Sequence, residues 1–316
     1  MRMPQHPASQ TLRGRLRIYS ILCQYLRFLA LRWARAGSGS TARGVVRLGD
    51  FEVDTRLEGA DGRYRAKLSP DWEIWGPNGG YVAAIALRAV GMEATLPRPV
   101  SFSGHFISVA RFAPVDVVVE PIRVGRRAES FRVRIVQDGR LVLEALVRTA
   151  SEGPGYQHDA SPAPEVPDPE SIAAPDEEDF YPFWKNLDRR WVVPRELGPV
   201  PEALPPHWIS WHRFRPRATF DDPFLDAGRS LLLIDTLGWP AASLAHVGPE
   251  YIALSLDVTA WFHRLTPDEE WLMAEHRGPV AEAGLMGVTG EVRNREGRLI
   301  ASGGSQLLCV PRPADV

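Results

Sequence analysis

Two long apolar runs interrupt a chain that otherwise alternates apolar with polar residues over short segments. The first run is Tyr81–Ala94 and the second is Phe224–Ala245. Both are apolar on nearly all sides, which is typical of a helix that is buried all round. The short segments around them have the period of two that predicts antiparallel strands with one face in water. The pattern therefore indicates two buried helices among antiparallel strands.

The expected strands form two groups with the same order around their helix. In each group at least one short strand segment precedes the helix, two in the first group and one in the second, and four antiparallel strands follow it. The first group consists of Asp50–Leu57, Arg63–Leu68, Ser101–Val109, Val115–Val124, Ser130–Gln137 and Leu141–Thr149. The second group consists of Trp208–Arg217, Ile252–Phe262, Glu270–Arg277, Met286–Asn294 and Leu299–Val310. A curved sheet wrapped around one helix explains why each helix is apolar all round, so we expect an α+β fold of two such modules.

The two groups resemble copies of one sequence. Each copy has an apolar helix, an aromatic strand and a hairpin with Gly-Arg-Leu at its turn. The corresponding stretches are Gly79–Ala89, Ser101–Phe106 and Asp138–Arg148 in the first copy, and Leu231–Ala241, Ala253–Arg264 and Glu296–Gln306 in the second. Phe106 and Gly139 are 33 residues apart, and Phe262 and Gly297 are 35 apart. We infer an internal duplication with a long period, in which two related modules are fused in tandem.

Three polar residues distinguish the second copy, namely Asp235, Ser255 and Gln306. Asp235 follows four apolar residues on the predicted helix, where a carboxylate is costly to remove from water unless it has partners. A Ser hydroxyl and a Gln amide could be those partners and still hold a water molecule. The alternative is a partnered core carboxylate without chemistry. Because the first copy has Ala, Leu or Arg where Asp235 would fall, we expect one working site per chain.

Glycine and proline mark the start of the first helix and the interior of the second. The stretch that ends in Gly79-Gly80 predicts a bend into the first helix. Its glycines have neither the phosphate-loop nor the dinucleotide spacing, so we expect them to expose helix N-terminal N–H groups, which suit a carbonyl oxygen or a phosphate. In the second helix Pro240 has no N–H for the carbonyl of Thr236, which predicts a kink just after Asp235.

Composition is that of a globular protein in a reducing compartment. The chain has 316 residues, enough for two domains, with 44% hydrophobic and 24% charged residues. It contains no uncharged apolar run of about 18 residues, so we expect no transmembrane helix. Two cysteines make neither a disulfide framework nor a metal site, which favours the cytoplasm. We expect no metal and no other cofactor.

Residues 1–44 differ in charge from the rest of the chain. They hold eight Arg and no acid, for a charge of +8, and because the whole chain has a net charge of −2 the remainder carries −10. An acidic body argues against nucleic acid as a partner. Leucines and arginines over residues 12–35 have the spacing of a basic amphipathic helix that would contact an anionic membrane, and a targeting peptide is another interpretation. We favour a basic extension outside the fold.

A stretch rich in proline and acids separates the two copies. Residues 151–182 hold seven prolines and a run of acids, which is typical of a linker. We therefore expect an N-terminal module over 45–150, a linker over 151–204 whose aromatic later part packs on the surface, and a C-terminal module over 205–316. Fused modules place sheet edges in each chain, and because edges need covering we expect a homodimer.

Several motifs follow one another in a specific order along the two halves of the chain. In the first half they are Trp75–Tyr81 and His105-Phe106, and in the second they are Asp235, Ser255-Leu256-Asp257, Trp261–Arg264 and Ala301-Ser302 leading to Gln306. With them the chain resembles the double-hotdog acyl-CoA thioesterases, the acyl-CoA thioesterase II-like family, over most of the body. The resemblance implies a tandem hotdog fold, association of chains, an acyl-CoA substrate and hydrolysis of a fatty acyl-CoA or related thioester to free acid and CoA.

The resemblance also implies site residues. In that family a helix Asp, a strand Thr or Ser, and a Gln hold the hydrolytic water, which implies Asp235, Ser255 and Gln306 here. Ser255 stands where many members have Thr, and Gln306 lies one residue further from Ala301-Ser302 than in the family pattern. Thioester hydrolysis needs a base, a positioned water and donors for the developing oxyanion. Backbone N–H groups at Gly79 and Gly80 are the expected donors.

Two other functions use the same scaffold. One is a non-catalytic acyl-CoA or lipid-binding protein on a decayed thioesterase scaffold, which is distinguished by whether Asp235 and Gln306 meet in space. The other is a hydratase, which would need an Asp-x-Asn-Pro-x-His-like stretch that the sequence lacks. His105 and His263 are not accompanied by a Gly-x-Ser-x-Gly motif, so we expect them to pack or to line a rim.

Two further sets of residues are candidates near the site. Asp257 lies two residues from Ser255 and is expected on the same strand face, either orienting the site or paired with an Arg. Four tryptophans are candidates for an acyl groove, although each alone is more often part of a core: Trp72, Trp75, Trp239 and Trp261.

Overall fold

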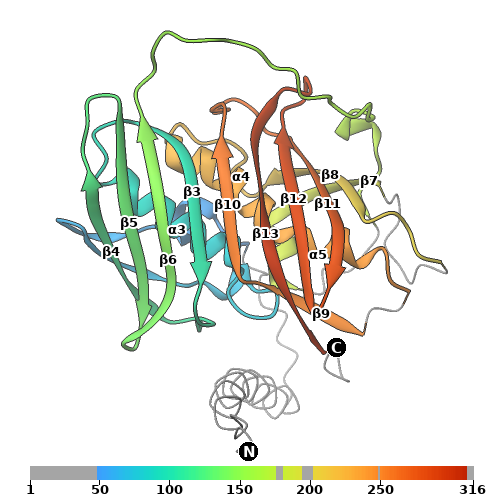
Figure 1. Cartoon of the computed structure of the whole chain (residues 1–316), viewed down its shortest axis with the longest axis horizontal. Helices are drawn as coiled ribbons and strands as arrows, with labels where there is room; N and C mark the ends of the chain where they lie inside the picture. Colours follow the sequence, from blue (N-terminus) through green and yellow to red (C-terminus); the bar gives the residue numbers. More distant parts are fainter. Residues whose placement is uncertain (1–47, 176–180, 194–201, 248–249, 312–316) are drawn as a thin grey trace, which may run out of the picture. The chain divides into compact units, whose positions relative to one another are not determined.

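One antiparallel sheet of 13 strands runs through both halves of the chain (Figure 1). The computed structural model describes residues 48–175, 181–193, 202–247 and 250–311. The first half contains β1 (Glu58–Ala60), β2 (Arg63–Lys67), β3 (Arg98–Phe106), β4 (Pro114–Arg123), β5 (Ala128–Gln137) and β6 (Arg140–Ala150). The second half contains β7 (Leu187–Val193), β8 (His207–Phe214), β9 (Tyr251–Ser255), β10 (Asp257–Phe262), β11 (Leu272–Glu282), β12 (Leu285–Arg293) and β13 (Leu299–Pro311).

The strand order repeats between the halves, as the sequence repeat predicts. Neighbouring strands follow the order β1-β2-β4-β5-β6-β3-β10-β13-β12-β11-β8-β7, with β9 paired to the end of β13. From the centre outward, the first half has β3-β6-β5-β4-β2 and the second has β10-β13-β12-β11-β8. Apart from β9, each strand of one half thus has a counterpart at the same distance from the centre in the other half.

Strands β3 and β10 join the two halves. Their register places Gly104 opposite Val258 and Phe102 opposite Ala260. These four residues face inward and are buried. A single hydrophobic cluster contains buried residues from both halves. The two modules therefore share one core and one sheet.

The helices α3 (Gly79–Gly91) and α4 (Pro223–Thr236) pack against each other in opposite directions on the inner face of the sheet. Small residues permit the close approach. A methyl group on Gly228, in the middle of α4, would lie 3.6 Å from Cβ of Ala84. At the end of α3, a methyl group on Gly91 would lie 2.6 Å from the ring of Phe224, which begins the buried part of α4. The start of α3 correspondingly meets the end of α4.

The predicted interruption of the second helix is confirmed. Helix α4 ends at Thr236, and the short helix α5 (Gly238–Ser243), which contains Pro240, begins after Leu237. The break leaves Asp235 in the last turn of α4. Across the described ranges, no helix is both long enough and apolar enough to span a membrane.

Two strand predictions are wrong in detail. The stretch Asp50–Leu57 begins with a short helix, α2 (Phe51–Asp54), because the side chain of Asp50 accepts hydrogen bonds from the N–H groups of the first turn. The predicted strand Ile252–Phe262 is interrupted at Leu256, which separates β9 from β10. That interruption decides which way the residues on either side face.

The residues of the predicted linker, 151–204, differ in structure along their length. Residues 151–175 form no strand, and they contain one short 3-10 helix, η2 (Pro169–Ser171). After it come η3 (Pro182–Asn186) and strand β7, which pairs with β8, and Phe183 is fully buried. Helix η3 packs against the first half, since Phe183 meets Trp72 edge to face with ring centroids 5.8 Å apart, whereas β7 extends the sheet of the second half. The predicted basic extension, residues 1–44, lies outside the described residues.

Candidate active site

Asp235 lies in the last turn of α4, where it meets the start of α3. Its side chain is 5% exposed. A methyl group on Gly79 would lie 2.8 Å from Oδ2 of Asp235, and one on Gly80 would lie 2.7 Å from Cα of Leu232. Such distances are too short for a real Cβ, so only glycine lets α3 begin this close to α4. The two glycines predicted from the sequence are therefore beside the predicted acid.

The pKa of Asp235 is raised to about 6, mainly because burial disfavours the charged carboxylate. The Ser255 hydroxyl and the backbone N–H of Gly80 act in the opposite direction and stabilise the charge, whereas the negative charge of Asp257 raises the pKa further. Oδ1 of Asp235 is buried and has no hydrogen-bond partner among the described residues. The result is a carboxylate that is mostly ionised at neutral pH and keeps one oxygen available.

Asn78 fastens the two helices together at this point. Its Oδ1 accepts a hydrogen bond from the N–H of Tyr81 at 2.9 Å and so caps α3. Its Nδ2 donates to Oγ1 of Thr236 at 3.0 Å, across the junction. The N–H groups of a first helical turn have no intrahelical acceptor and carry partial positive charge. Asn78 thus holds that positive end of α3 against the carboxylate.

Ser255 is brought to Asp235, as predicted. It is the last residue of β9, and it pairs with Leu307 of β13. Leu307 is 1% exposed and faces the helices, so Ser255, as its partner in the register, faces the same way. The hydroxyl lies close enough to lower the pKa of Asp235.

Gln306 does not join this pair, and the prediction that it meets Asp235 is wrong. Strand β13 runs in regular register against β12, with Ser305 opposite Val288 and Gln306 opposite Gly287. Val288 faces the helices, since a methyl group on Gly238 would lie 2.6 Å from it. Ser305 therefore faces inward and Gln306 faces the outer side of the sheet, because neighbouring strand residues point to opposite faces.

Ser305, which the sequence pattern did not single out, is the inward-facing polar residue of this stretch. It is 7% exposed, and its Oγ has no hydrogen-bond partner within the described part of the chain. The signal was present in the sequence: Gln306 stands one residue further from Ala301-Ser302 than the family pattern, and in a strand one residue reverses the face.

Asp257 lies on the other face of the sheet from Ser255, contrary to the prediction. The strand is irregular at Leu256, so the regular alternation of faces does not continue from β9 into β10. Asp257 pairs with the exposed His105 and accepts a hydrogen bond from the N–H of Gln306 at 2.9 Å. It contributes its charge to the site and no direct contact.

The candidate tryptophans separate into three environments. Trp75 and Trp239 meet edge to face, with ring centroids 5.5 Å apart, and Nε1 of Trp75 donates to the hydroxyl of Tyr181 at 2.7 Å. Trp72 is fully buried in the core. Trp261 is 53% exposed on the outer face of β10, so its predicted place beside Trp75 and Trp239 is wrong. It faces outward because neighbouring residues of a strand point to opposite faces and Ala260, the residue before it, faces inward.

Neither His105 nor His263 contributes to the site. His105 is exposed on the outer face of β3, and His263 places Nε2 2.9 Å from Oγ of Ser302. The ranges that the structure describes hold no group of three or more His, Cys, Asp or Glu side chains placed to bind a metal ion.

A buried Ser–His pair lies elsewhere in the second half. Oγ of Ser210 is 2.7 Å from Nε2 of His212, and Nε1 of Trp208 donates to the same hydroxyl at 2.8 Å. Burial lowers the pKa of His212 to about 3, with the charge of Arg189 adding to the effect. Both members of the pair are 0% exposed, so a bulky thioester has no access to the hydroxyl. The pair is structural and provides no accessible nucleophile.

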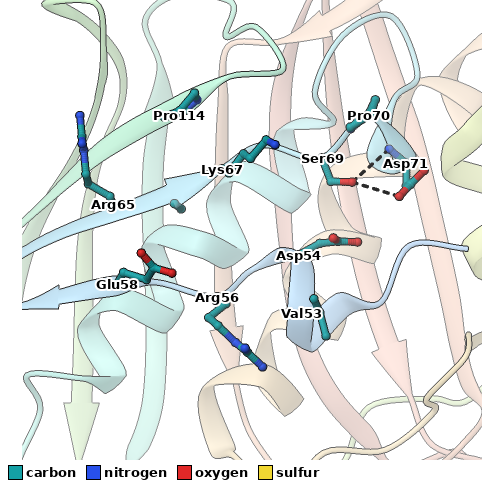
Figure 2. A pocket seen from close by; sticks show the side chains of 11 residues that line it. Val53, Asp54, Arg56, Glu58, Arg65, Lys67, Ser69, Pro70, Asp71 and Pro114 are labelled. Carbon is teal, nitrogen blue, oxygen red and sulfur yellow. Dashed lines mark hydrogen bonds between the residues drawn. The ribbon is translucent and has the colours of Figure 1, made fainter. Parts of the chain in front are cut away.

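A cavity of about 690 Å³ lies between α2, β2 and the loop before α3 (Figure 2). Its lining includes three cations and three acids, so its formal charges balance, and neither Asp235 nor Ser255 lines it. Two lining residues hold the hydroxyl of Tyr81, in the first turn of α3: Asp54 accepts from it at 2.6 Å through its carbonyl, and the N–H of Ser69 donates to it at 3.2 Å. The walls of this cavity support the start of α3.

Comparisons with known proteins agree with this architecture. A model of the acyl-CoA thioesterase N-terminal domain matches residues 68–150, and a model of the acyl-CoA thioesterase C-terminal domain matches residues 159–310. A solved conserved protein of unknown function with hot dog fold, from Alicyclobacillus acidocaldarius, is similar with a TM-score of 0.73 at 20% identity, over 83% of this chain and 98% of that one.

Two mycobacterial structures are similar over the same extent. The tesB protein of Mycobacterium avium subs paratuberculosis has a TM-score of 0.69 at 25% identity, over 84% of this chain and 99% of its own. The acyl-CoA thioesterase II TesB2 of Mycobacterium marinum has a TM-score of 0.68 at 24% identity, over 84% of this chain and 98% of its own. The predicted α+β tandem hotdog fold is thereby confirmed. With both domain models matched in order over most of its length, the chain belongs to the acyl-CoA thioesterase family and is a thioester hydrolase.

Proposed function

We propose that the protein hydrolyses fatty acyl-CoA and related acyl-CoA thioesters with a water molecule activated by Asp235. One observation carries this proposal: a buried carboxylate, with a pKa of about 6 and an unpartnered Oδ1, lies at the N-terminus of α3. A general base works best when its pKa is near the working pH, because it is then both deprotonated and basic. Ordinary surface carboxylates are too weakly basic for this task.

The proposed reaction consumes one water and releases one acid and one thiol. Oδ1 of Asp235 takes a proton from the water while the water oxygen bonds to the thioester carbon. The carbonyl then re-forms, the carbon–sulfur bond breaks, and the CoA sulfur leaves and receives the proton from Asp235. Ser255 keeps the carboxylate oriented throughout. The carboxylate thus begins and ends the cycle ionised.

Gly79 is the proposed donor to the carbonyl oxygen. Of the N–H groups in the first turn of α3, that of Tyr81 is taken by Asn78 and that of Gly80 acts on Asp235. The N–H of Gly79 has no acceptor within its own helix and lies at the positive end of the helix dipole. A fixed donor there would stabilise the negative charge that develops on the carbonyl oxygen. Trp75 and Trp239 are the proposed walls for the acyl group.

The second candidate is a protein that binds acyl-CoA without hydrolysing it. The observation in its favour is the outward direction of Gln306, because a meeting of Asp235 and Gln306 was the criterion for a working site. Against it stand the raised pKa and the free Oδ1 of Asp235, which a purely structural carboxylate does not need. Turnover separates the two candidates directly.

The test is a panel of acyl-CoA esters scored by release of free thiol, with the variants Asp235→Asn and His105→Ala. Loss of the general base should lower kcat by about 10²–10⁴-fold and leave KM within about threefold. His105 is an exposed residue on the opposite face of the sheet, so its variant should retain the parental rate. Near-parental turnover by Asp235→Asn would remove Asp235 from the mechanism, and binding without turnover by the parent would establish the second candidate.

We further propose that the chain works as a homodimer in the cytoplasm, in fatty acid metabolism. In support, the sheet ends in two edge strands, β1 and β7, which need covering, and Cys309 is a free thiol. Light scattering at micromolar concentration should give the mass of two chains. A clean monomer mass would reject the dimer.

A further inference from the structure

Among the buried polar atoms that have no hydrogen-bond partner in the described residues, one belongs to the end of α4, one to α5 and one to the inner face of β13. They are Oδ1 of Asp235, Nε1 of Trp239 and Oγ of Ser305. Buried polar atoms without partners are uncommon, and each calls for an explanation such as a catalytic role. An acceptor, a donor and a hydroxyl that can do both form a set that suits a water molecule and a reacting carbonyl.

The strand register places Ser305 on the face of β13 that carries Leu307, the partner of Ser255. Ser255, which lies beside Asp235, pairs with Leu307, and Ser305 is the next residue of β13 on that face. Trp239 packs against a cluster that contains Leu307 and Val288. Val288 pairs with Ser305, so the indole and Ser305 are both neighbours of the same cluster.

We propose that Ser305 is the residue that positions the attacking water beside Asp235, in the role that the family resemblance implies for Gln306. The inference rests on the proposed function. A water that is to attack a carbonyl must direct a lone pair at the carbon and therefore needs acceptors for both of its protons. Oδ1 of Asp235 accepts the proton that is transferred, and Oγ of Ser305 accepts the other.

Trp239 has a different part in this arrangement. An indole N–H only donates, so it cannot accept a proton of the water. It can donate to the water oxygen before attack or to the carbonyl oxygen during it. Its ring packs against the cluster that contains Leu307 and Val288, so the indole is held on the inner side of the sheet.

Ser305 and Gln306 form a matched pair for the test, because they are adjacent in β13 and face opposite sides. Ser305→Ala should lower kcat by about 10-fold or more with KM within about threefold, since the hydroxyl acts on the water and not on substrate binding. Ser305→Thr keeps the hydroxyl and should recover most of that loss. Gln306→Ala should retain the parental kcat, KM and melting temperature.

The melting temperature distinguishes positioning from structural support. Removing a buried hydroxyl that has no partner should leave the melting temperature unchanged or raise it, so a fall in kcat without a fall in stability marks a role in the reaction. Should Ser305→Ala fail to fold, Ser305→Cys, which keeps the side-chain volume, takes its place.

Parental kcat in Ser305→Ala, or a loss in Gln306→Ala that matches Asp235→Asn, would overturn the inference. Failure of this inference is distinguishable from failure of the proposed function. If Asp235→Asn is inactive while Ser305→Ala is fully active, Asp235 remains the base and Ser305 has no part in holding the water. If Asp235→Asn retains full activity, the proposed function itself is wrong.

Discussion

Gly79 and Asp235 approach so closely that a methyl group on Gly79 would lie 2.8 Å from Oδ2 of the carboxylate. The two residues come from different modules, since Gly79 begins α3 and Asp235 ends α4. The carboxylate of one module is therefore held against the positive helix end of the other. Neither module contains the site alone.

Replacing each glycine of this junction by alanine should separate activity from folding. In Gly79→Ala the obstacle is the end of a side chain, Oδ2 of Asp235, which can move aside; we expect a folded protein with kcat lowered by about 10-fold, because the base is displaced. In Gly80→Ala the obstacle is the backbone of Leu232, 2.7 Å away, which cannot move without shifting α4. That overpacking should cost about 1–3 kcal/mol of folding free energy.

The pair is checked by thermal melts and thiol-release kinetics on both variants. A Gly80→Ala variant as stable as the parent would show that the helices can separate freely at this point. Parental kcat in a folded Gly79→Ala would show that the position of Asp235 is not critical.

The rate should depend on pH through the ionisation of Asp235. Its pKa of about 6 predicts that kcat/KM rises with pH between about 5 and 7 and is then level, because the carboxylate must be ionised to act as base. Ser255→Ala removes a hydrogen bond that stabilises the charge, so the rising limb should move to higher pH. Product formation followed by chromatography avoids thiol reagents whose own response varies with pH. An unchanged limb in Ser255→Ala would contradict the assigned contact.

Asp235→Asn should make the protein more stable at neutral and alkaline pH. The native pKa is raised from 3.8 to about 6, so the folded state binds the proton more tightly than the unfolded chain and loses stability as pH rises through that interval. Above about pH 6 the buried charge costs on the order of 3 kcal/mol. The amide carries no charge, so melts at pH 8 should show a raised melting temperature, and melts near pH 3.5 should show little difference. An equal effect at both pH values would contradict a charge origin.

Asn78 provides a prediction that separates capping from the contact across the junction. Asn78→Ala loses both the cap of α3 and the hydrogen bond to Thr236, and should cost about 0.5–2 kcal/mol of stability. Asn78→Asp keeps an acceptor for the N–H of Tyr81 but adds a negative charge near Asp235, which should raise the pKa of that group. The expected result is near-parental stability with the rising limb of the pH–rate curve moved upward. Denaturant unfolding and pH–rate profiles of the two variants provide the check.

Most of the fold could be predicted from local pattern. Helices that are apolar on all sides require enclosure, and alternating segments require one wet face, so the repeat of helix and sheet followed directly from the order of residues. Asp235 was a candidate for the same local reason, since a lone acid in an apolar helix is costly unless it has partners. The structure places the Ser255 hydroxyl close to it.

The errors arise where distant strands decide the outcome. Whether Gln306 or Ser305 faces the helices depends on the register of β13 against β12, and whether Ser255 and Asp257 share a face depends on the break at Leu256. A register shift of one residue moves every side chain of the strand to the other face of the sheet, and the sequence of a single strand does not reveal its register. Strand β7 was assigned to the linker because its neighbours are rich in proline and acids, although its partner strand lies in the second half.

The ring of Phe224 against Gly91 has a consequence for the symmetry of the molecule. The start of α4 meets the end of α3 as the start of α3 meets the end of α4, so the duplicated plan provides two equivalent junctions, one with a carboxylate and one closed by a phenyl ring. If the two modules were identical separate chains, the carboxylate and the phenyl ring would both have to occur at both junctions, because every substitution in one chain would also be present in the other. When the copies are joined in one chain, each can diverge. One junction can then carry the reactive groups while the other is filled by hydrophobic packing. A titration with a non-hydrolysable acyl-CoA analogue should accordingly saturate at one molecule per chain.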